Sequence, residues 1–167
     1  MKILETERLL LRELEPEGDA AFMLEVLNEP AFIANVADRG VRTIDDAKEY
    51  IRERILPSYT EHGFGFYLVE LKESGEPVGI SGLVKRETMD DVDIGFSTLE
   101  KYWGRGYAFE AAAALMAHGR TVHGLPRIVG ATAPHNHASA RLLEKLGLRY
   151  ERMVRLPGYT DDSRLFT

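Results

Sequence analysis

The chain contains no cysteine among its 167 residues, and it also lacks a long apolar run. Without cysteine it can form neither a disulfide framework, nor a cysteine-ligated metal site, nor a cysteine acyl-enzyme. A membrane-spanning helix needs about 18 apolar residues, and charged Glu5, Glu7 and Arg8 interrupt the N-terminus before a signal-like segment forms. We therefore expect a soluble, cytoplasmic protein that does not bind a membrane.

A basic surplus is also missing. The formal net charge is −6, and lysine and arginine are scattered among aspartate and glutamate rather than gathered in a run. This distribution argues against nucleic-acid binding, and an acidic surface weakly favours a cationic acceptor. Internal repeats and low-complexity tracts are absent, and a length of 167 residues with 44% hydrophobic content predicts one domain spanning residues 1–167.

The periodicity of apolar residues predicts alternating strands and helices. We expect strands over residues 8–14, 64–71, 78–84, 92–98, 127–132, 149–154 and 162–166. We expect helices from a cap at Asp19 to Asn28, from a capping box at Thr43 to Pro57, and over residues 107–122 and 138–146. The second, third and fourth strands should form an antiparallel meander. This order predicts an α+β fold with one βαβ-like centre.

The most informative segment is the turn Gly104-Arg105-Gly106, which opens an alanine-rich helix. Backbone N–H groups at such a turn can bind a pyrophosphate, and Arg105 could pair with a phosphate. The alternative is that the glycines only satisfy the backbone angles of the turn. The sequence has no Walker-type phosphate loop, and a dinucleotide fingerprint would need a third glycine where Phe109 stands.

A second informative segment starts at Asn136, which precedes a predicted helix and could simply cap it. His135 and His137 flank this residue. Two histidines spaced by two residues, with no third ligand nearby, make a poor zinc site, so we expect no metal. The turn Gly-x-Ser-x-Gly that serine hydrolases use is also absent.

Three stretches resemble, in order and spacing, the hallmark segments of the GNAT family of N-acetyltransferases. They are TERLLLREL at 6–14, YWGRGYAFEA at 102–111 and NHASARLLEKLGL at 136–148. The likeness is greatest to the branch that includes the ribosomal-protein N-terminal acetyltransferases. It implies a mixed, mostly antiparallel central sheet flanked by helices and splayed between the strands at 92–98 and 127–132. Acetyl-CoA would bind in that gap and donate its acetyl group to a primary amine by direct transfer in a ternary complex.

The resemblance also implies roles for individual residues. The cofactor-binding positions are Phe96, Ser97, Thr98 and Leu99 for the pantetheine, and Trp103, Gly104, Arg105, Gly106, Tyr107 and Ala108 for the pyrophosphate. Asn136 would hydrogen-bond the pantetheine arm. Ser139 would bind near the thioester and stabilise the departing thiolate, because Leu143 occupies the place of the tyrosine that many relatives use. Glu110 matches a glutamate of the family helix, and we expect it to be a structural hydrogen-bonding carboxylate.

Asp93 is the candidate general base, since the resemblance implies that an acidic residue before the Ile-Gly pair can relay a proton. The alternative is an ordinary carboxylate on the exposed face of a strand. Deprotonating a lysine at pH 7 costs about 4.6 kcal/mol, whereas an α-amino group costs about 1.1 kcal/mol. A weak base therefore suffices for a protein N-terminal α-amine, which we favour as the acceptor.

A small-molecule amine remains open as the acceptor. The acceptor-facing segments are expected at residues 32–41, 61–66 and 153–161. Two alternatives to an enzyme also stay open at this point: a catalytically silent acyl-CoA-binding module, and an interaction domain that retains only the fold. The sequence does not distinguish a monomer from a homodimer.

Overall fold

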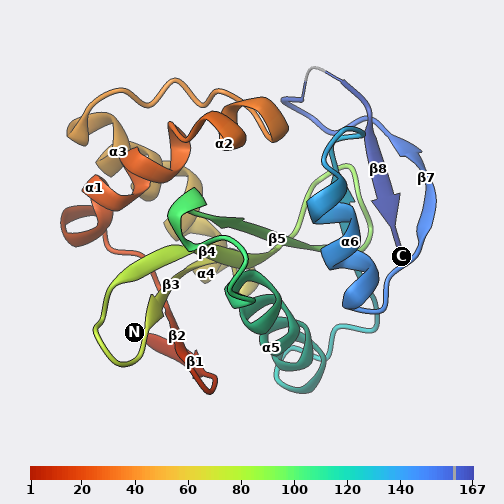
Figure 1. Ribbon diagram of the computed structural model, residues 1–167, viewed down its shortest axis with the longest axis horizontal. Helices are drawn as coiled ribbons and strands as arrows, with labels where there is room; N and C mark the ends of the chain where they lie inside the picture. Colours follow the sequence, from red (N-terminus) through yellow and green to blue (C-terminus); the bar gives the residue numbers. More distant parts are fainter. Residues whose placement is uncertain (160) are drawn as a thin grey trace.

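A central eight-stranded sheet runs through the computed structural model, which describes residues 1–159 and 161–167 (Figure 1). The strand order is β1-β2-β3-β4-β5-β6-β8-β7. The strands are β1 (Lys2–Glu5), β2 (Leu9–Arg12), β3 (Phe66–Leu71), β4 (Pro77–Val84), β5 (Val92–Thr98), β6 (Ile128–Thr132), β7 (Tyr150–Val154) and β8 (Ser163–Phe166). Only the β5–β6 pair is parallel among these described strands, so the predicted mixed, mostly antiparallel sheet is confirmed.

Helices flank this sheet. They are α1 (Pro16–Leu27), α2 (Pro30–Asn35), α3 (Ile44–Tyr50), a π-helical turn (Ile51–Ile55), α4 (Leu56–His62), a 3₁₀ turn (Glu100–Tyr102), α5 (Tyr107–Thr121) and α6 (His137–Lys145). Figure 1 shows α1, α2 and α3 grouped beyond one end of β5, with α6 beside β8 at the other end. Helix α5 packs on β4 and β5. Among the described residues, no helix has the length and apolar character that crossing a membrane requires.

The sheet opens between β5 and β6. Only two residue pairs join these strands, Val92 with Ile128 and Asp93 with Val129. Beyond them β5 stays paired with β4 as far as Thr98, while β6 pairs with β8. The edge of β5 that faces β4 and the edge of β6 that faces β8 keep their hydrogen bonds. The two strands can therefore part without disturbing the β4–β5 and β6–β8 ladders. The predicted splay between these strands is therefore confirmed.

The first predicted helix start was wrong. Helix α1 begins at Pro16 rather than after a cap at Asp19, because the fixed φ of proline suits the first helical position. The Asp19 carboxylate lies inside the helix, where it accepts hydrogen bonds from Arg12 Nη1 and Nη2 at 2.9 and 2.8 Å. It also accepts from the Glu15 N–H at 2.7 Å. An ion pair between the end of β2 and α1 therefore uses the side chain that local spacing had assigned to a cap.

The capping box at Thr43 is confirmed, with Asp46 as its second member. The predicted end of that helix at Pro57 was wrong. A π-helical turn follows α3, and Pro57 then occupies the first turn of α4, where a missing N–H costs little. The helix ends instead at Gly63, which has φ 82°. Strand β1 and helix α2 were not predicted, because segments of four and six residues carry too little periodicity.

Candidate active site

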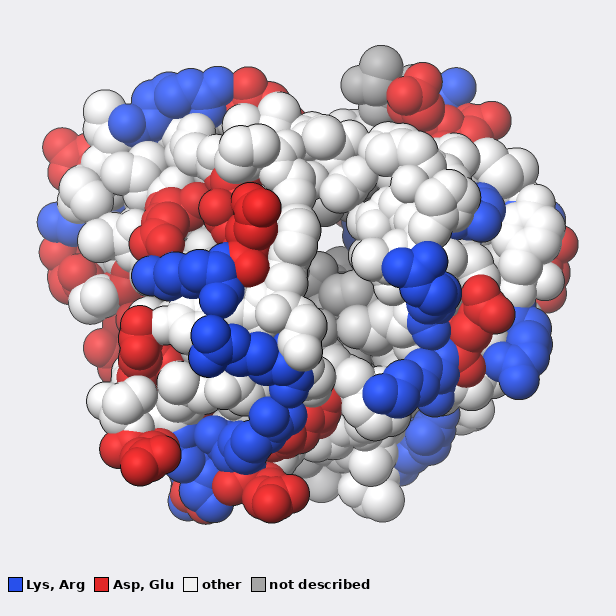
Figure 2. Space-filling view, viewed as in Figure 1, with Lys and Arg blue, Asp and Glu red and all other residues white. Residues whose placement is uncertain are grey.

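A cavity of about 530 Å³ occupies the gap between β5 and β6. This volume lies in the usual range for small-molecule sites. Figure 2 shows the hollow between the two halves of the molecule, with blue basic side chains on both rims. On the α6 side the basic lining residues are Arg141 and Lys145. A negatively charged chain could therefore run along the mouth of the cavity, although the formal net charge of the protein is −6.

The turn before α5 forms one wall of the cavity. Gly104 and Gly106 have φ 76° and 80°, and no side chain caps the first turn of α5. The N–H groups of that turn therefore lack a side-chain acceptor. A Cβ atom built on Gly104 would meet nothing within 4 Å, so the approach to the turn is open. These features fit a pyrophosphate bound by backbone amides at the positive end of the helix dipole.

Two contacts hold the turn in place. The Trp103 indole Nε1 donates a hydrogen bond to the Thr98 carbonyl at 2.7 Å, and Arg8 Nη1 donates to the Arg105 carbonyl at 2.9 Å. The Arg105 side chain does not line the cavity, and its guanidinium carbon lies 5.8 Å from the centre of the Tyr102 ring. The backbone of Arg105 thus belongs to the turn, whereas its charged side chain lies near Tyr102 and not in the cavity.

Glu110 is the hydrogen-bond partner of two residues in the first hallmark stretch, 6–14. Its carboxylate accepts hydrogen bonds from the Thr6 hydroxyl, from the Arg8 N–H at 3.0 Å and from Arg8 Nε at 2.7 Å. Burial by itself would raise the pKa of Glu110, but the hydrogen bonds from Thr6 and Arg8 outweigh it and lower the pKa. Glu110 does not line the cavity. Its structural role is confirmed, and it joins the β1–β2 hairpin to the start of α5.

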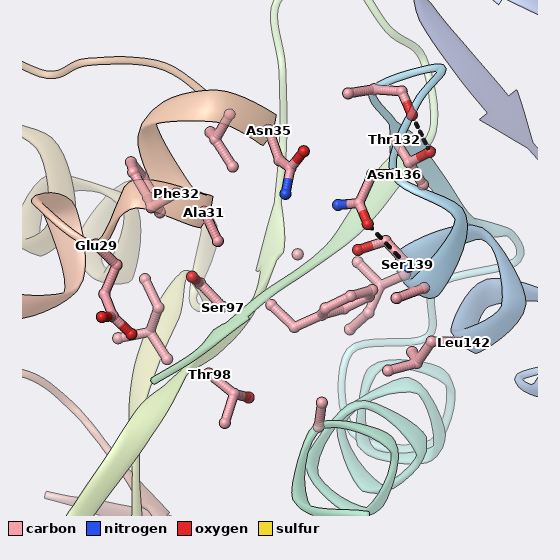
Figure 3. A pocket seen from close by; sticks show the side chains of 18 of the residues that line it. Glu29, Ala31, Phe32, Asn35, Ser97, Thr98, Thr132, Asn136, Ser139 and Leu142 are labelled. Carbon is pink, nitrogen blue, oxygen red and sulfur yellow. Dashed lines mark hydrogen bonds between the residues drawn. The ribbon is translucent and has the colours of Figure 1, made fainter. Parts of the chain in front are cut away.

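Strand β5 supplies the floor of the cavity. Phe96, Ser97 and Thr98 line it, whereas Leu99 does not. Leu99 is 3% exposed, and its N–H donates to the Val78 carbonyl, so it belongs to the core. In Figure 3 Ser97 points towards α2 and Thr98 towards the opposite side, as alternation along a strand requires. The cavity thus has an α5 side and an α2 side that meet at β5.

Asn136 and Ser139 stand on the α6 side of the gap. Asn136 Oδ1 accepts a hydrogen bond from the Ser139 N–H at 3.2 Å, so the capping role of Asn136 is confirmed. Because the oxygen is engaged, the amide nitrogen is the atom that faces the cavity, towards Asn35 of α2 in Figure 3. The Ser139 hydroxyl also points into the cavity. The cap therefore leaves one N–H₂ donor and one hydroxyl available to a ligand.

Position 143, where many relatives carry a tyrosine, does not face the cavity in this protein. Its side chain is 1% exposed. A Cβ atom built on Gly130 of β6 would lie only 2.5 Å from Leu143 Cδ2, so the two residues pack closely. Position 143 thus faces the sheet. Ser139, one turn earlier, is the hydroxyl that this helix presents to the cavity.

Asp93 lies at the closed end of the gap, where β5 and β6 part. It is 2% exposed, so the alternative of an exposed strand carboxylate is wrong. Asp93 Oδ2 accepts a hydrogen bond from Arg86 Nε at 2.9 Å, and Oδ1 has no hydrogen-bond partner among the described residues. Burial raises the pKa of Asp93 to about 6, although the charge of Arg86 opposes this shift. The carboxylate is therefore mostly ionised at pH 7 and has one free oxygen.

The three segments expected to face the acceptor all contribute to the cavity. The contributors are Phe32, Asn35, Val36 and Arg39 from the first, Phe66 from the second, and Leu156 and Tyr159 from the third. Thr160 of the third segment lies outside the described residues. Sequence reasoning missed Tyr50 and Arg86. Tyr50 falls within the helix expected after Thr43, and Arg86 lies in a loop without periodicity, so no sequence signal distinguished either one.

Replacing Gly104 with alanine should weaken acetyl-CoA binding about tenfold, because a methyl group would occupy the open approach to the amides. Gly124→Ala is the matched control. Gly124 also has positive φ and open space around its Cβ position, but it does not line the cavity. Isothermal titration should show a loss of affinity only for the Gly104 variant. Equal affinities in the two variants would remove the pyrophosphate assignment.

Asn136→Asp should separate the cap from the ligand contact. Aspartate keeps the acceptor oxygen that caps α6 but loses the N–H₂ donor. We expect the Kd for acetyl-CoA to rise several-fold, about as much as in Asn136→Ala, while only the alanine variant loses about 1 kcal/mol of stability. Titration and thermal unfolding measure the two effects. Wild-type affinity in the aspartate variant would show that Asn136 only caps the helix.

Comparisons with known proteins agree with this geometry. The family model described as acetyltransferase (GNAT) domain matches residues 8–149. A Bacillus licheniformis protein described as the uncharacterized N-acetyltransferase p20 is 29% identical over 157 residues, which cover 93% of this chain and 86% of that protein. The structure of a GNAT-family acetyltransferase from Bordetella pertussis is 27% identical with a TM-score of 0.80, covering 99% of this chain and 98% of that one.

A further structural neighbour is RimL, described as a ribosomal L7/L12 α-N-protein acetyltransferase in complex with coenzyme A. It has a TM-score of 0.82 at 20% identity and covers 99% of this chain and 96% of its own, which is a likeness of fold. The family match spans most of the chain and includes the turn, the α6 cap and the splayed strands. The chain therefore belongs to the GNAT family of acetyltransferases, which use acetyl-CoA as acyl donor, and it is an N-acetyltransferase.

Proposed function

We propose that this enzyme transfers the acetyl group of acetyl-CoA directly to a primary α-amine, with both substrates bound in one cavity of a single domain formed by residues 1–167. The observation that carries the proposal is the position of Asp93 Oδ1. It is a buried carboxylate oxygen without a described partner, and it belongs to a residue that lines the same cavity as Ser139 and the turn before α5. A base, a donor to the leaving group and an anion-binding turn thus share one space.

Different groups of the chain bind the cosubstrate and stabilise the leaving thiolate. The amides of the turn and the Asn136 side chain bind the cosubstrate, which supplies an activated thioester when bound. The Ser139 hydroxyl donates a hydrogen bond to the developing thiolate charge. A serine hydroxyl is a weak acid, so it stabilises this charge rather than giving up its proton fully. Holding both reactants in one cavity supplies much of the rate enhancement.

Asp93 accepts the proton of the acceptor. With its pKa near 6, taking a proton from an α-ammonium group of pKa about 7.8 costs about 2 kcal/mol, whereas a lysine of pKa about 10.4 would cost about 6 kcal/mol. The difference supports an α-amine, and RimL acts on a protein α-amine by its description. A small-molecule amine is the second candidate, supported by the depth at which Asp93 lies in the cavity.

The direct test is release of free coenzyme A thiol in the presence of a panel of amines. The protein contains no cysteine, so a thiol reagent reports only the product. Initial rates at varied concentrations of both substrates should give intersecting lines, as a ternary complex requires. Parallel lines would indicate an acyl-enzyme and contradict direct transfer. Binding of acetyl-CoA without thiol release from any amine would fit the silent binding module instead.

Ser139→Ala should lower kcat about tenfold or more while changing the Kd of acetyl-CoA little, because the hydrogen bond forms mainly in the transition state. The backbone N–H that Asn136 binds remains in this variant, so α6 keeps its cap. Steady-state kinetics and titration give the two quantities. A parallel loss in both would assign Ser139 to binding, and an unchanged kcat would remove it from the mechanism.

Asp93→Asn should change the pH dependence of the reaction. In the wild type, Asp93 gains the proton that the amine loses, so kcat/KM should change little between about pH 6 and the pKa of the amine, and log kcat/KM should fall with a slope of about one below about pH 6. The variant cannot take up this proton, so its log kcat/KM should rise with a slope of about one until the pH reaches the pKa of the amine. Recovery near pH 8 indicates the α-amine of a peptide, and recovery towards pH 10 indicates a lysine, a polyamine or a free α-amino acid.

Asp91→Asn is the control for this experiment. Asp91 lies two residues from Asp93, but it pairs with Arg127 at 3.4 Å and does not line the cavity. Its pH profile should match the wild type. If the Asp93 variant also keeps the wild-type profile, another group accepts the proton.

A further inference from the structure

A cluster of charged and aromatic side chains surrounds Asp93 on the α2 side of the cavity. We call it the arginine cluster, and its members are Arg39, Tyr50, Arg86, Asp93 and Tyr159. They come from five separate segments: the α2–α3 loop, α3, the β4–β5 loop, β5 and the β7–β8 loop. All five residues line the same cavity, so segments from both halves of the molecule meet at Asp93.

The cluster holds two guanidinium groups and one carboxylate. Arg86 uses its Nε to donate to Asp93 Oδ2 at 2.9 Å. Arg39 Nε is buried and has no hydrogen-bond partner among the described residues. A buried N–H of a cation that meets no acceptor is costly, and such groups in proteins normally find a partner. The cluster therefore has a surplus positive charge and an unused donor.

Neighbouring carboxylates do not neutralise this surplus. Asp38 is adjacent in sequence to Arg39, but it accepts a hydrogen bond from Arg42 at 2.6 Å. Asp162, on the loop that carries Tyr159, accepts from Arg155 at 2.8 Å. Both carboxylates are thus engaged outside the cavity. Glu29 lines the same cavity but accepts a hydrogen bond from the Glu100 N–H at 2.7 Å, and the five cluster residues by themselves carry one net positive charge.

The two tyrosines orient the guanidinium groups without supplying charge. The guanidinium carbons of Arg39 and Arg86 lie 5.9 and 5.7 Å from the centre of the Tyr159 ring. Burial raises the pKa of Tyr50, so its phenol stays neutral. The Tyr50 side chain also hydrogen-bonds Arg39, and the Tyr159 side chain hydrogen-bonds Arg86, which leaves the other N–H groups of these planar cations for an anion. A carboxylate matches this arrangement, because guanidinium groups bind it with paired hydrogen bonds.

We propose that the arginine cluster binds a carboxylate of the acceptor, so that the substrate is a primary amine carrying a carboxylate a few bonds from its nitrogen. The inference rests on the acetyl transfer proposed above and names its substrate class. The amine lies at Asp93 Oδ1, and the carboxylate lies at the N–H groups of Arg39 and Arg86. Because Arg86 Nε is only 2.9 Å from Asp93, the two subsites are adjacent, as the two ends of an α-amino acid are.

The same chemistry can come from two sources. A free α-amino acid offers its own carboxylate, and a peptide offers one when its first residue is aspartate or glutamate. The acidic net charge of the whole chain favours a cationic acceptor, but charge close to the reacting nitrogen acts at short range through a low dielectric. The local positive charge therefore favours a carboxylated acceptor from either source.

The test compares acceptors that differ only in the carboxylate. Leucine and glutamate are each measured against their α-amides, and a tetrapeptide amide that begins with aspartate is measured against its asparagine counterpart. The amides have the more easily deprotonated α-amine, so a preference for the acid must come from its carboxylate. We expect kcat/KM to favour the carboxylated member by about tenfold or more in at least one pair, and that pair identifies the source.

Arg39→Gln should remove that preference by raising the KM of the carboxylated acceptor about tenfold, while the KM of the neutral acceptor changes much less and acetyl-CoA keeps its Kd. Arg39→Lys should restore part of it, since lysine keeps the charge but not the planar geometry. Arg120→Gln is the control, because Arg120 is exposed and does not line this cavity. Titration of the acetyl-CoA-free protein with each pair measures the same preference without turnover.

The outcomes separate the inference from the proposed function. Acetylation of neutral amines with equal rates in every pair would overturn the carboxylate subsite and leave acetyl transfer intact. A carboxylate preference in titration without thiol release from any amine would keep the subsite and overturn the proposed function. A preference that survives Arg39→Gln unchanged would also overturn the inference, because the carboxylate would then bind elsewhere.

Discussion

The parting of β5 from β6 is the constraint on which the rest of the site depends. Two parallel strands that separate after only two residue pairs would leave unsatisfied backbone groups in most sheets. Here β4 and β8 continue to pair with the outer edges, so the gap costs no hydrogen bonds on those sides. The gap places the turn before α5, the cap of α6 and the floor of β5 around one cavity.

Contacts outside the cavity hold the two walls of this gap in position. On one side Glu110 binds Thr6 and Arg8, which attaches the first hairpin to α5, and Arg8 also supports the carbonyl of Arg105. On the other side Leu143 packs against Gly130, which has no side chain to keep the helix at a distance. The hallmark stretches at 6–14 and 136–148 are therefore partly scaffold for the stretch at 102–111.

Asp93 combines two opposing effects. Its position where the strands meet removes water from the carboxylate and raises its pKa, while Arg86 keeps it from becoming neutral at pH 7. A fully exposed aspartate would be a weaker base, and an isolated buried one would hold its proton. The pair with Arg86 thus keeps the carboxylate ionised on a residue that lines the cavity, and the five residues of the arginine cluster together carry one net positive charge, opposite in sign to that of the whole chain.

Much of this protein followed from local sequence. The strands from β3 to β8, the capping box at Thr43 and the Gly-x-Gly turn all rest on periodicity or on backbone angles that a few neighbouring residues determine. Chain neighbours also placed Asn136 at the start of α6. Such features depend on contacts within a few residues, so the order of amino acids is enough to predict them.

Only the tertiary structure decided the features that depend on distant partners. Asp19 pairs with Arg12 instead of capping the start of a helix, and Leu99 lies in the core instead of lining the cavity. Asp93 became a buried carboxylate because β6 and Arg86 enclose it, and the arginine cluster unites five segments that chain order alone does not bring together. Burial, pKa and charge balance are sums over neighbours in space, and a sequence names those neighbours only once the chain has folded.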